Sequence, residues 1–214
     1  MLGIHHYGLF LLAGILLNLT PGQDTMFILG RGLTGGRRAG IAAALGISVG
    51  SIGHTLAAAL GLSVILATSA HAFAAVKLAG AAYLVYLGLR LLVAPGAGEP
   101  PAAGSGKRRS ADAPQVRSAF LQGALTNALN PKVALFFLAF LPQFIEPASP
   151  TRTLAFLALG GTFITTGLAW CLVLASGAAR LQGFFAQNPR LRAGIDRVVG
   201  ALFVALGARL AWAR

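Results

Sequence analysis

The segment NLTPGQDTMFIL, residues 18–29, places an amide, a hydroxyl, a Pro-Gly pair and a carboxylate inside an apolar stretch of the chain. Proline lacks an N–H and its ring clashes with the preceding turn, so Pro21 predicts a break in the helix. We expect Thr20 to be the N-cap of a second half-helix, with Pro21 at its first position and Gln23 completing a T-x-x-Q capping box. The segment therefore predicts that one apolar run is built from two half-helices.

The composition of the chain is that of a membrane protein. Of its 214 residues, 56% are hydrophobic and only 10% are charged, and the mean hydropathy is +0.75. Six apolar runs reach or exceed the roughly 20 residues that a helix needs to cross about 30 Å of hydrocarbon. We therefore predict an all-α integral membrane protein with six transmembrane helices, of which the first and the fourth are broken. The runs are residues 7–29, 39–67, 72–94, 119–145, 153–175 and 195–212.

The positive charge of the chain lies in alternate loops. The net charge is +12, yet the basic residues sit in short segments between apolar runs, whereas a nucleic-acid site gathers them on one solvated face. By the positive-inside rule, the loops after the first, third and fifth runs are cytoplasmic and both termini are outside. We expect a multi-pass protein of the bacterial inner (plasma) membrane that binds no nucleic acid. The single cysteine, Cys171, leaves no disulfide framework and no thiol metal cluster.

The two halves of the chain resemble each other. Residues 95–117 are rich in Pro, Gly, Ser and charge, which is typical of a flexible cytoplasmic linker between a first repeat at 1–94 and a second at 118–214. Three strings match in order: TP at 20 with NP at 130, ALG at 44 with ALG at 158, and GAAYLVYLGLRLL at 80 with GALFVALGARLA at 200. The offsets between matched residues are 110, 114 and then 119, the last for Gly88 and Gly207. Because each half has three crossings, the halves would form a 3+3 inverted repeat, as in many secondary transporters.

The second half repeats the helix break. In NALNPK, Asn130 is expected to be an N-cap and Pro131 the first helical residue. Two helix starts would then face the middle of the bilayer, where their N–H groups and partial positive charge suit a carboxylate. The other interpretation is a pair of plain proline kinks that neighbouring helices stabilise.

Three ionisable side chains inside the apolar runs are candidates for function. Asp24 is expected to face the bundle interior, because a carboxylate in hydrocarbon costs at least about 2.5 kcal/mol; it would bind an amine or a proton, or act as a structural acceptor. Lys132 would bind a substrate carboxylate, pair with Asp24, or extend to a membrane interface. His54 would relay protons or form a hydrogen bond across a helix interface. The run around His54 also carries a polar stripe and a pair of small residues suited to close helix approach: Ser48, Ser51 and Thr55, and Gly46 and Gly50.

These motifs are shared with a known family. LTPGQD in the first run, GRRAGIAAALGISVG leading into the second, KLAGAAYLVYLGLRLL in the third and FLQGALTNALNPKVALFFLAFLPQFI in the fourth give a chain that resembles the LysE/RhtB family of bacterial amino-acid exporters. The resemblance covers nearly the whole chain and implies export of amino acids or close derivatives, driven by the proton gradient. Where the family commonly has Pro-Gly-Pro, this chain has Gln23, a difference that bears on substrate choice. The family's motif positions, carried onto this sequence, are Pro21, Gly22, Asp24, Asn127, Asn130, Pro131 and Lys132.

The observations favour secondary active export of amino acids by proton antiport with alternating access. The predicted partners are an amino-acid substrate, protons and the lipid bilayer, while a monomer and a homodimer both stay open. The predicted substrate-binding residues are Asn18, Thr20, Pro21, Gly22, Asp24, Asn127, Asn130, Pro131 and Lys132, and the predicted proton-coupling residues are Asp24 and His54.

Other classes of function fit less well. An intramembrane enzyme needs catalytic groups that converge on one site, but the other carboxylates lie in loops or at helix ends, so we expect no enzyme, no cofactor and no metal site. An exporter or channel for another small solute or a metal ion is the alternative, although a hard-metal site would want more carboxylates. The four other carboxylates are Glu99, Asp112, Glu146 and Asp196.

Overall fold

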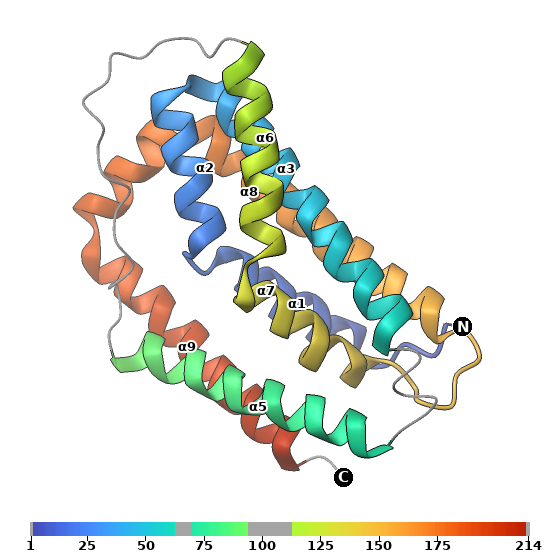
Figure 1. Ribbon diagram of the computed structural model, residues 1–214. Coiled ribbons are helices and arrows are strands. Elements are labelled where there is room, and N and C mark those ends of the chain that lie inside the picture. Colours follow the sequence, from blue (N-terminus) through green and yellow to red (C-terminus); the bar gives the residue numbers. More distant parts are fainter. Residues whose placement is uncertain (1, 63–69, 94–112, 213–214) are drawn as a thin grey trace.

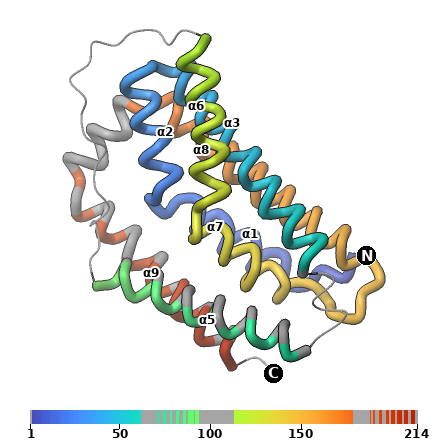
Figure 2. The backbone as a smooth tube through the Cα atoms, in the orientation of Figure 1, coloured from blue at the N-terminus to red at the C-terminus, as the bar shows by residue number. Residues whose placement is uncertain are grey.

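The computed structural model describes residues 2–62, 70–93 and 113–212, which are helical over most of their length (Figures 1 and 2). The prediction of an all-α protein is confirmed for this part of the chain, where one isolated antiparallel bridge joins Ile4 to Ile145. Short π-helical turns (η1, η2) and a 3₁₀ turn (η3) continue the longer helices. The elements are α1 (Tyr7–Leu19), α2 (Gln23–Thr34), α3 (Gly36–Ala57), η1 (Ala58–Leu62), α5 (Ala70–Val93), α6 (Ala113–Ala128), α7 (Pro131–Leu135), η2 (Phe136–Phe140), η3 (Leu141–Phe144), α8 (Arg152–Gln187) and α9 (Pro189–Trp212).

The first break is present, but its cap is not the predicted one. The Thr20 hydroxyl donates to the carbonyl oxygen of Leu16 at 2.7 Å, so this side chain closes the end of α1. Gly22, in an extended conformation (φ −157°, ψ −167°), is the residue that precedes α2. The prediction of Thr20 as N-cap, with Pro21 at the first helical position and a T-x-x-Q capping box, is therefore wrong. The reason is that a threonine hydroxyl can bond back to the preceding turn as well as forward to the next helix.

The second break follows the sequence prediction. The Asn130 side chain accepts a hydrogen bond from the backbone N–H of Lys132 at 3.0 Å, and Pro131 is the first residue of α7. Across this break, the axes of Ala113–Ala128 and Pro131–Phe144 differ by 46°. Both breaks thus occur at the predicted prolines, with different capping chemistry.

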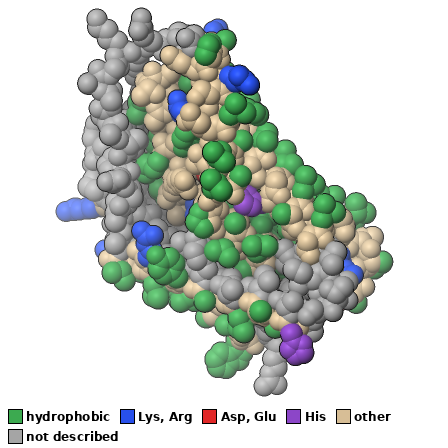
Figure 3. Space-filling model, viewed as in Figure 1, with side chains coloured by type: hydrophobic (Ala, Val, Ile, Leu, Met, Phe, Trp, Pro, Cys, Tyr) green, Lys and Arg blue, Asp and Glu red, His purple; other side chains and the backbone are tan. Residues whose placement is uncertain are grey.

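The number of membrane-spanning helices is tested only in part. Within the described residues, two helices are long and apolar enough to cross a membrane, Gly36–Gly61 and Arg152–Ala178, and the bent pair of α6 with α7 to η3 makes a third if it counts as one span. Hydrophobic side chains are scattered over the described part of the face seen in Figure 3. The prediction of six spans goes beyond these and stays a prediction. Along α3, large exposed side chains recur at three- and four-residue spacing, as a lipid-facing stripe requires; they are Leu45, Val49, Ile52 and Leu56.

The linker prediction falls mostly outside the described residues. Residues 94–112 are not described, and α6 begins at Ala113, within the segment 95–117 that composition favours as a linker. The division into repeats at 1–94 and 118–214 stays a prediction.

Glycines set the closest helix contacts. A Cβ added to Gly46 of α3 would collide with the carbonyl oxygen of Phe120 in α6, and one on Gly50 would lie 2.7 Å from that of Ala124. The small-residue pair of α3 therefore lets α6 approach closely, as the sequence predicts. This contact brings the end of α6 against α3 at the level of the second break.

Helices α5 and α9 lie side by side (Figure 1) and share a reciprocal contact. A Cβ on Gly88 would lie 2.6 Å from the carbonyl oxygen of Gly200, and one on Gly207 would lie 2.8 Å from that of Ala81. Adding the offset of 119 found in the sequence converts Gly88 to Gly207 and Ala81 to Gly200. The two contacts are therefore equivalent under exchange of the two halves.

An aromatic cluster forms the core beside the breaks. Phe136, in the turn that continues α7, has its ring centroid 6.2 Å from that of Phe10 in α1, 5.0 Å from Phe140 and 4.9 Å from Phe163 in α8. These rings are buried and hold α1, α8 and the second break together. The polar groups of the two breaks therefore lie beside a closely packed, apolar core.

Candidate functional site

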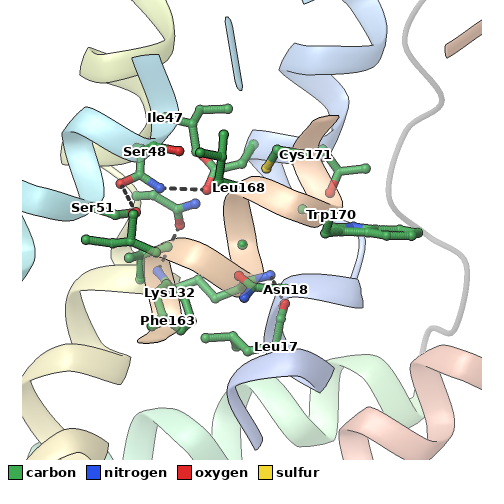
Figure 4. Close-up of a pocket in the computed structure, with 18 of the residues that line it drawn as sticks. Leu17, Asn18, Ile47, Ser48, Ser51, Lys132, Phe163, Leu168, Trp170 and Cys171 are labelled. Atoms are coloured by element: carbon green, nitrogen blue, oxygen red, sulfur yellow. Dashed lines mark hydrogen bonds between the residues drawn. The ribbon is translucent and has the colours of Figure 1, made fainter. Parts of the chain in front are cut away.

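A small cavity lies where the ends of α1 and α6 meet the starts of α2 and α7 (Figure 4). Its volume is about 40 Å³. A water needs roughly 10–15 Å³ of such space, so the cavity has room for about three waters and for nothing much larger. Pro21, Pro131 and His54 are outside its described lining. Seven of the nine predicted substrate-binding residues line it: Asn18, Thr20, Gly22, Asp24, Asn127, Asn130 and Lys132.

Asp24 is held by a chain of hydrogen bonds from two other helices. Its Oδ2 accepts from the Asn127 amide nitrogen at 2.8 Å, and the Asn127 amide oxygen accepts from the Ser51 hydroxyl at 3.1 Å. Because the serine donates to the amide oxygen, the NH₂ group of Asn127 faces the carboxylate. Asn127 is 1% exposed, so water does not compete for these bonds. The sequence prediction that Asp24 faces the bundle interior is confirmed.

The second carboxylate oxygen of Asp24 is in a different situation. Among the described residues, Oδ1 is buried and has no hydrogen-bond partner. A buried polar atom without a partner costs about 1–3 kcal/mol, and more when it is charged. Such an atom beside a cavity is suited to a donor from outside the chain, either a ligand N–H or a proton.

Lys132 reaches from the second break to the first. Its ammonium group donates to the carbonyl oxygens of Leu17 at 3.0 Å and Thr20 at 3.1 Å, which are at the end of α1. The side chain therefore points into the protein, and the alternative in which it extends to a membrane interface is wrong. The end of α1 carries partial negative charge, so a cation is stabilised there.

His54 contacts the end of α6. Its Nε2 lies 3.0 Å from the backbone oxygen of Asn127, which can only accept, so Nε2 carries the proton and donates. The ring also stacks on Phe137 with centroids 5.9 Å apart. Of the two roles left open by the sequence, the contact across a helix interface is present, and the role in proton transfer stays a prediction.

The remaining hydroxyls of the sequence stripe mostly bond their own helix. Ser48 donates to the oxygen of Ala44 and Thr55 to that of Ser51. Thr162, Thr165 and Thr166 of α8 likewise donate to carbonyls three or four residues earlier, as expected for threonines in membrane helices. Ser48 and Ser51 both line the cavity, and Ser51 is the member of the α3 stripe whose hydroxyl bonds to Asn127.

Helix α8 supplies the apolar wall of the cavity, which sequence reasoning missed. Its lining side chains come from one face of a long apolar run, and nothing in the run marks that face in advance. Trp170 adds a buried indole N–H without a partner among the described residues. At Gly167, a Cβ would lie 3.2 Å from the amide oxygen of Asn18, so glycine leaves room for Asn18 there. The α8 wall consists of Phe163, Ile164, Gly167, Leu168, Trp170 and Cys171.

Comparison with known proteins shows the family of this chain. The profile of the LysE type translocator family matches residues 15–214. The chain belongs to this family. It is 32% identical over 212 residues to an uncharacterized membrane protein of Pseudomonas aeruginosa, with 99% of this chain and 97% of the relative covered. It is 31% identical to a membrane protein of Vibrio cholerae (99% and 98% covered) and 27% identical to a leucine efflux protein of Salmonella choleraesuis (98% and 96% covered).

No solved structure matches the chain. As a LysE type translocator, the protein is a membrane transporter of a small molecule, which confirms the resemblance found in the sequence. The cavity between the two breaks is the candidate for the place where that molecule binds.

Proposed function

We propose that this translocator is a secondary active exporter of amino acids in the bacterial inner membrane, working as a proton antiporter. The observation that carries the proposal is the buried, unpartnered Oδ1 of Asp24 beside the cavity between the two broken helices. The leucine efflux relative supports an amino-acid substrate.

The cavity lining offers a candidate partner for each charged group of an amino acid. The substrate ammonium group would donate to Asp24 Oδ1, which lacks a donor among the described residues. The substrate carboxylate would bind near the start of α2, where free backbone N–H groups carry partial positive charge, and near the Lys132 ammonium group. The polar part of the cavity lining would be completed by Asn18, Thr20, Gly22, Asn127 and Asn130. Pro21 and Pro131 would act by breaking the helices.

The side chain of the substrate would lie against α8. Phe163, Ile164 and Leu168 give that wall an apolar surface, and among its described residues no second carboxylate offers a partner for a basic side chain. A neutral, apolar amino acid therefore fits better than lysine or arginine, because burying an unpaired cation is costly.

Transport would proceed by alternating access of two inverted three-helix repeats. The reciprocal contact of Gly88 and Gly207 supports this internal symmetry. A cavity of about 40 Å³ is too small for an amino acid, so it must widen when substrate enters from either side. Six spans would place the basic loops in the cytoplasm and both termini outside.

Proton coupling would reside on Asp24, since one carboxylate can hold either a proton or the substrate amine but not both. Protonation from the outside would release the amino acid, and loss of that proton to the cytoplasm would restore the site. His54 would contribute by holding the end of α6, and a part in proton transfer is a further candidate role for it.

The test is efflux of each amino acid from bacterial cells loaded with dipeptides, with and without a protonophore. We expect faster efflux of a group of apolar amino acids that collapses with the proton gradient, and loss of this efflux in Asp24→Asn. Glu146→Gln is the matched control, because Glu146 is an exposed carboxylate in the loop before α8. Wild-type efflux from Asp24→Asn at normal abundance in the membrane would remove the role assigned to Asp24.

A further inference from the structure

The end of α1 has the character of a cation site. Its carbonyl oxygens at Leu17 and Thr20 both point to one nitrogen, the Nζ of Lys132, at 3.0 Å and 3.1 Å. The last carbonyls of a helix have no partners within that helix and carry partial negative charge. In transporters with broken helices, such C-terminal half-helix ends coordinate the sodium ion or proton that drives transport.

The local chain is shaped around this nitrogen. Gly22 follows the break, and a Cβ there would lie 3.4 Å from Lys132 Nζ and 4.0 Å from its Cε. These are ordinary van der Waals distances, so the elbow between α1 and α2 packs directly against the lysine head group. The backbone of Lys132 is fixed at the other break, where its N–H donates to the Asn130 side chain at 3.0 Å.

We propose that the end of α1 is a cation-binding site that the chain fills with its own lysine, so that the protein needs no sodium or other mobile metal cation. A tethered ammonium supplies the positive charge that the carbonyls require and, unlike sodium, does not exchange with solvent. The ion that moves during the transport cycle must then bind at another place in the protein. The statement about the cation site stands on the contacts of Lys132 alone, whereas its consequence for coupling rests on the proposed export function.

The first test is the thermal stability of the purified protein in detergent. Lys132→Ala removes the ammonium and leaves space, so we expect Tm to fall by several degrees and n-propylammonium or sodium chloride to restore much of the loss. Tetramethylammonium, which has the same charge but no N–H donor, should restore little. Lys132→Met removes the charge but fills the space, so it should lose stability and regain none with propylammonium.

Two further measurements complete the first test. Wild-type Tm should be the same in sodium and in choline buffer, because the site is already filled. Lys107→Ala, which removes one lysine from the predicted linker, should behave as wild type. Unchanged Tm in both Lys132 variants, or recovery by tetramethylammonium equal to that by propylammonium, would overturn the cation site.

The second test uses the wild-type protein in everted or proteoliposomal vesicles and so does not depend on folding of a variant. Amino-acid transport driven by a proton gradient should keep the same rate when sodium is replaced by choline. A rate that falls tenfold or more without sodium would overturn the inference while leaving amino-acid export intact. Absence of transport for every amino acid would overturn the proposed function, and the stability test would still decide the cation site.

Discussion

Replacing Asn127 with leucine tests the chain of hydrogen bonds that holds Asp24. Leucine branches at Cγ as asparagine does, so packing is largely kept, but both polar contacts of the amide are lost. One of these is the bond of 2.8 Å to the Asp24 carboxylate, and the other is the bond of 3.1 Å from the Ser51 hydroxyl. A hydrogen bond to a charged group contributes about 1.5–3 kcal/mol, and a neutral one about 0.5–1.5 kcal/mol.

These energies predict an order of effects. If the bond to Asp24 positions the carboxylate for its ligand, Asn127→Leu should lower the efflux rate at limiting substrate by about 10- to 150-fold. Ser51→Ala removes only the bond that orients the amide, and should lower that rate by about 2- to 10-fold. Thr165→Val is the control, because the exposed Thr165 hydroxyl donates to the carbonyl oxygen of Gly161 on its own helix.

The assay is the initial rate of efflux from vesicles, with Tm of the same preparations measured in parallel. Loss of rate at nearly constant Tm indicates that Asn127 acts on the site rather than on folding. Efflux from Asn127→Leu within twofold of wild type would refute the reasoning, and so would a larger defect in Ser51→Ala than in Asn127→Leu.

Two other predictions concern helix packing and are read from Tm. Gly46→Ala in α3 should destabilise by about 1–3 kcal/mol, since its Cβ collides with the backbone of α6. Gly53→Ala, on the same helix with nothing within 4 Å of the added Cβ, should be neutral or stabilising by up to about 1 kcal/mol. An equal loss of stability in Gly46→Ala and Gly53→Ala would contradict the close contact of α3 with α6. Gly88→Ala and Gly207→Ala should each destabilise by similar amounts of about 1–3 kcal/mol, because their contacts are equivalent. Their double variant should cost less than the sum, since one separation of α5 from α9 relieves both collisions, and full additivity would contradict the shared contact.

The sequence predicts the places of the helix breaks better than their caps. Proline restricts the backbone wherever it occurs, so Pro21 and Pro131 locate both breaks. The cap depends on which way one side chain turns. Asn130 accepts from the backbone ahead of it, whereas the Thr20 hydroxyl donates to the turn behind it. The local sequence permits a threonine hydroxyl to bond either forward or backward. The extended conformation of Gly22 decides between the two bonds, and that conformation is known only from the folded structure.

The candidate site was predictable in its polar half and not in its apolar half. A carboxylate or an ammonium group is costly in an apolar run wherever it points, so Asp24 and Lys132 are conspicuous in the sequence. Phe163 and Trp170 are ordinary residues of an apolar helix, and only packing shows that they face the cavity. Asn127 is predicted through the family resemblance alone, because an asparagine near a helix end often serves only as a cap.

Carbonyl groups at the two breaks account for Lys132 and His54, but not for Asp24. Leu17 and Asn127 are equivalent at the offset of 110, and each offers a backbone carbonyl near the end of its half-helix. The first carbonyl accepts from Lys132 and the second from His54. A half-helix that ends inside a membrane leaves carbonyls that lipid cannot satisfy, so these two side chains have a structural reason to be there.

Asp24 has no equivalent of this kind. Its Oδ2 is bound by Asn127, and its place in the first turn of α2 favours a carboxylate, but among the described residues Oδ1 remains buried without a donor. A carboxylate retained at such cost, and satisfied on one side only, is better explained by a ligand than by folding. Loss of function in Asp24→Asn with normal membrane insertion is therefore a stronger expectation than any defect in a His54 variant, where lost transport would not separate proton transfer from a disrupted helix end.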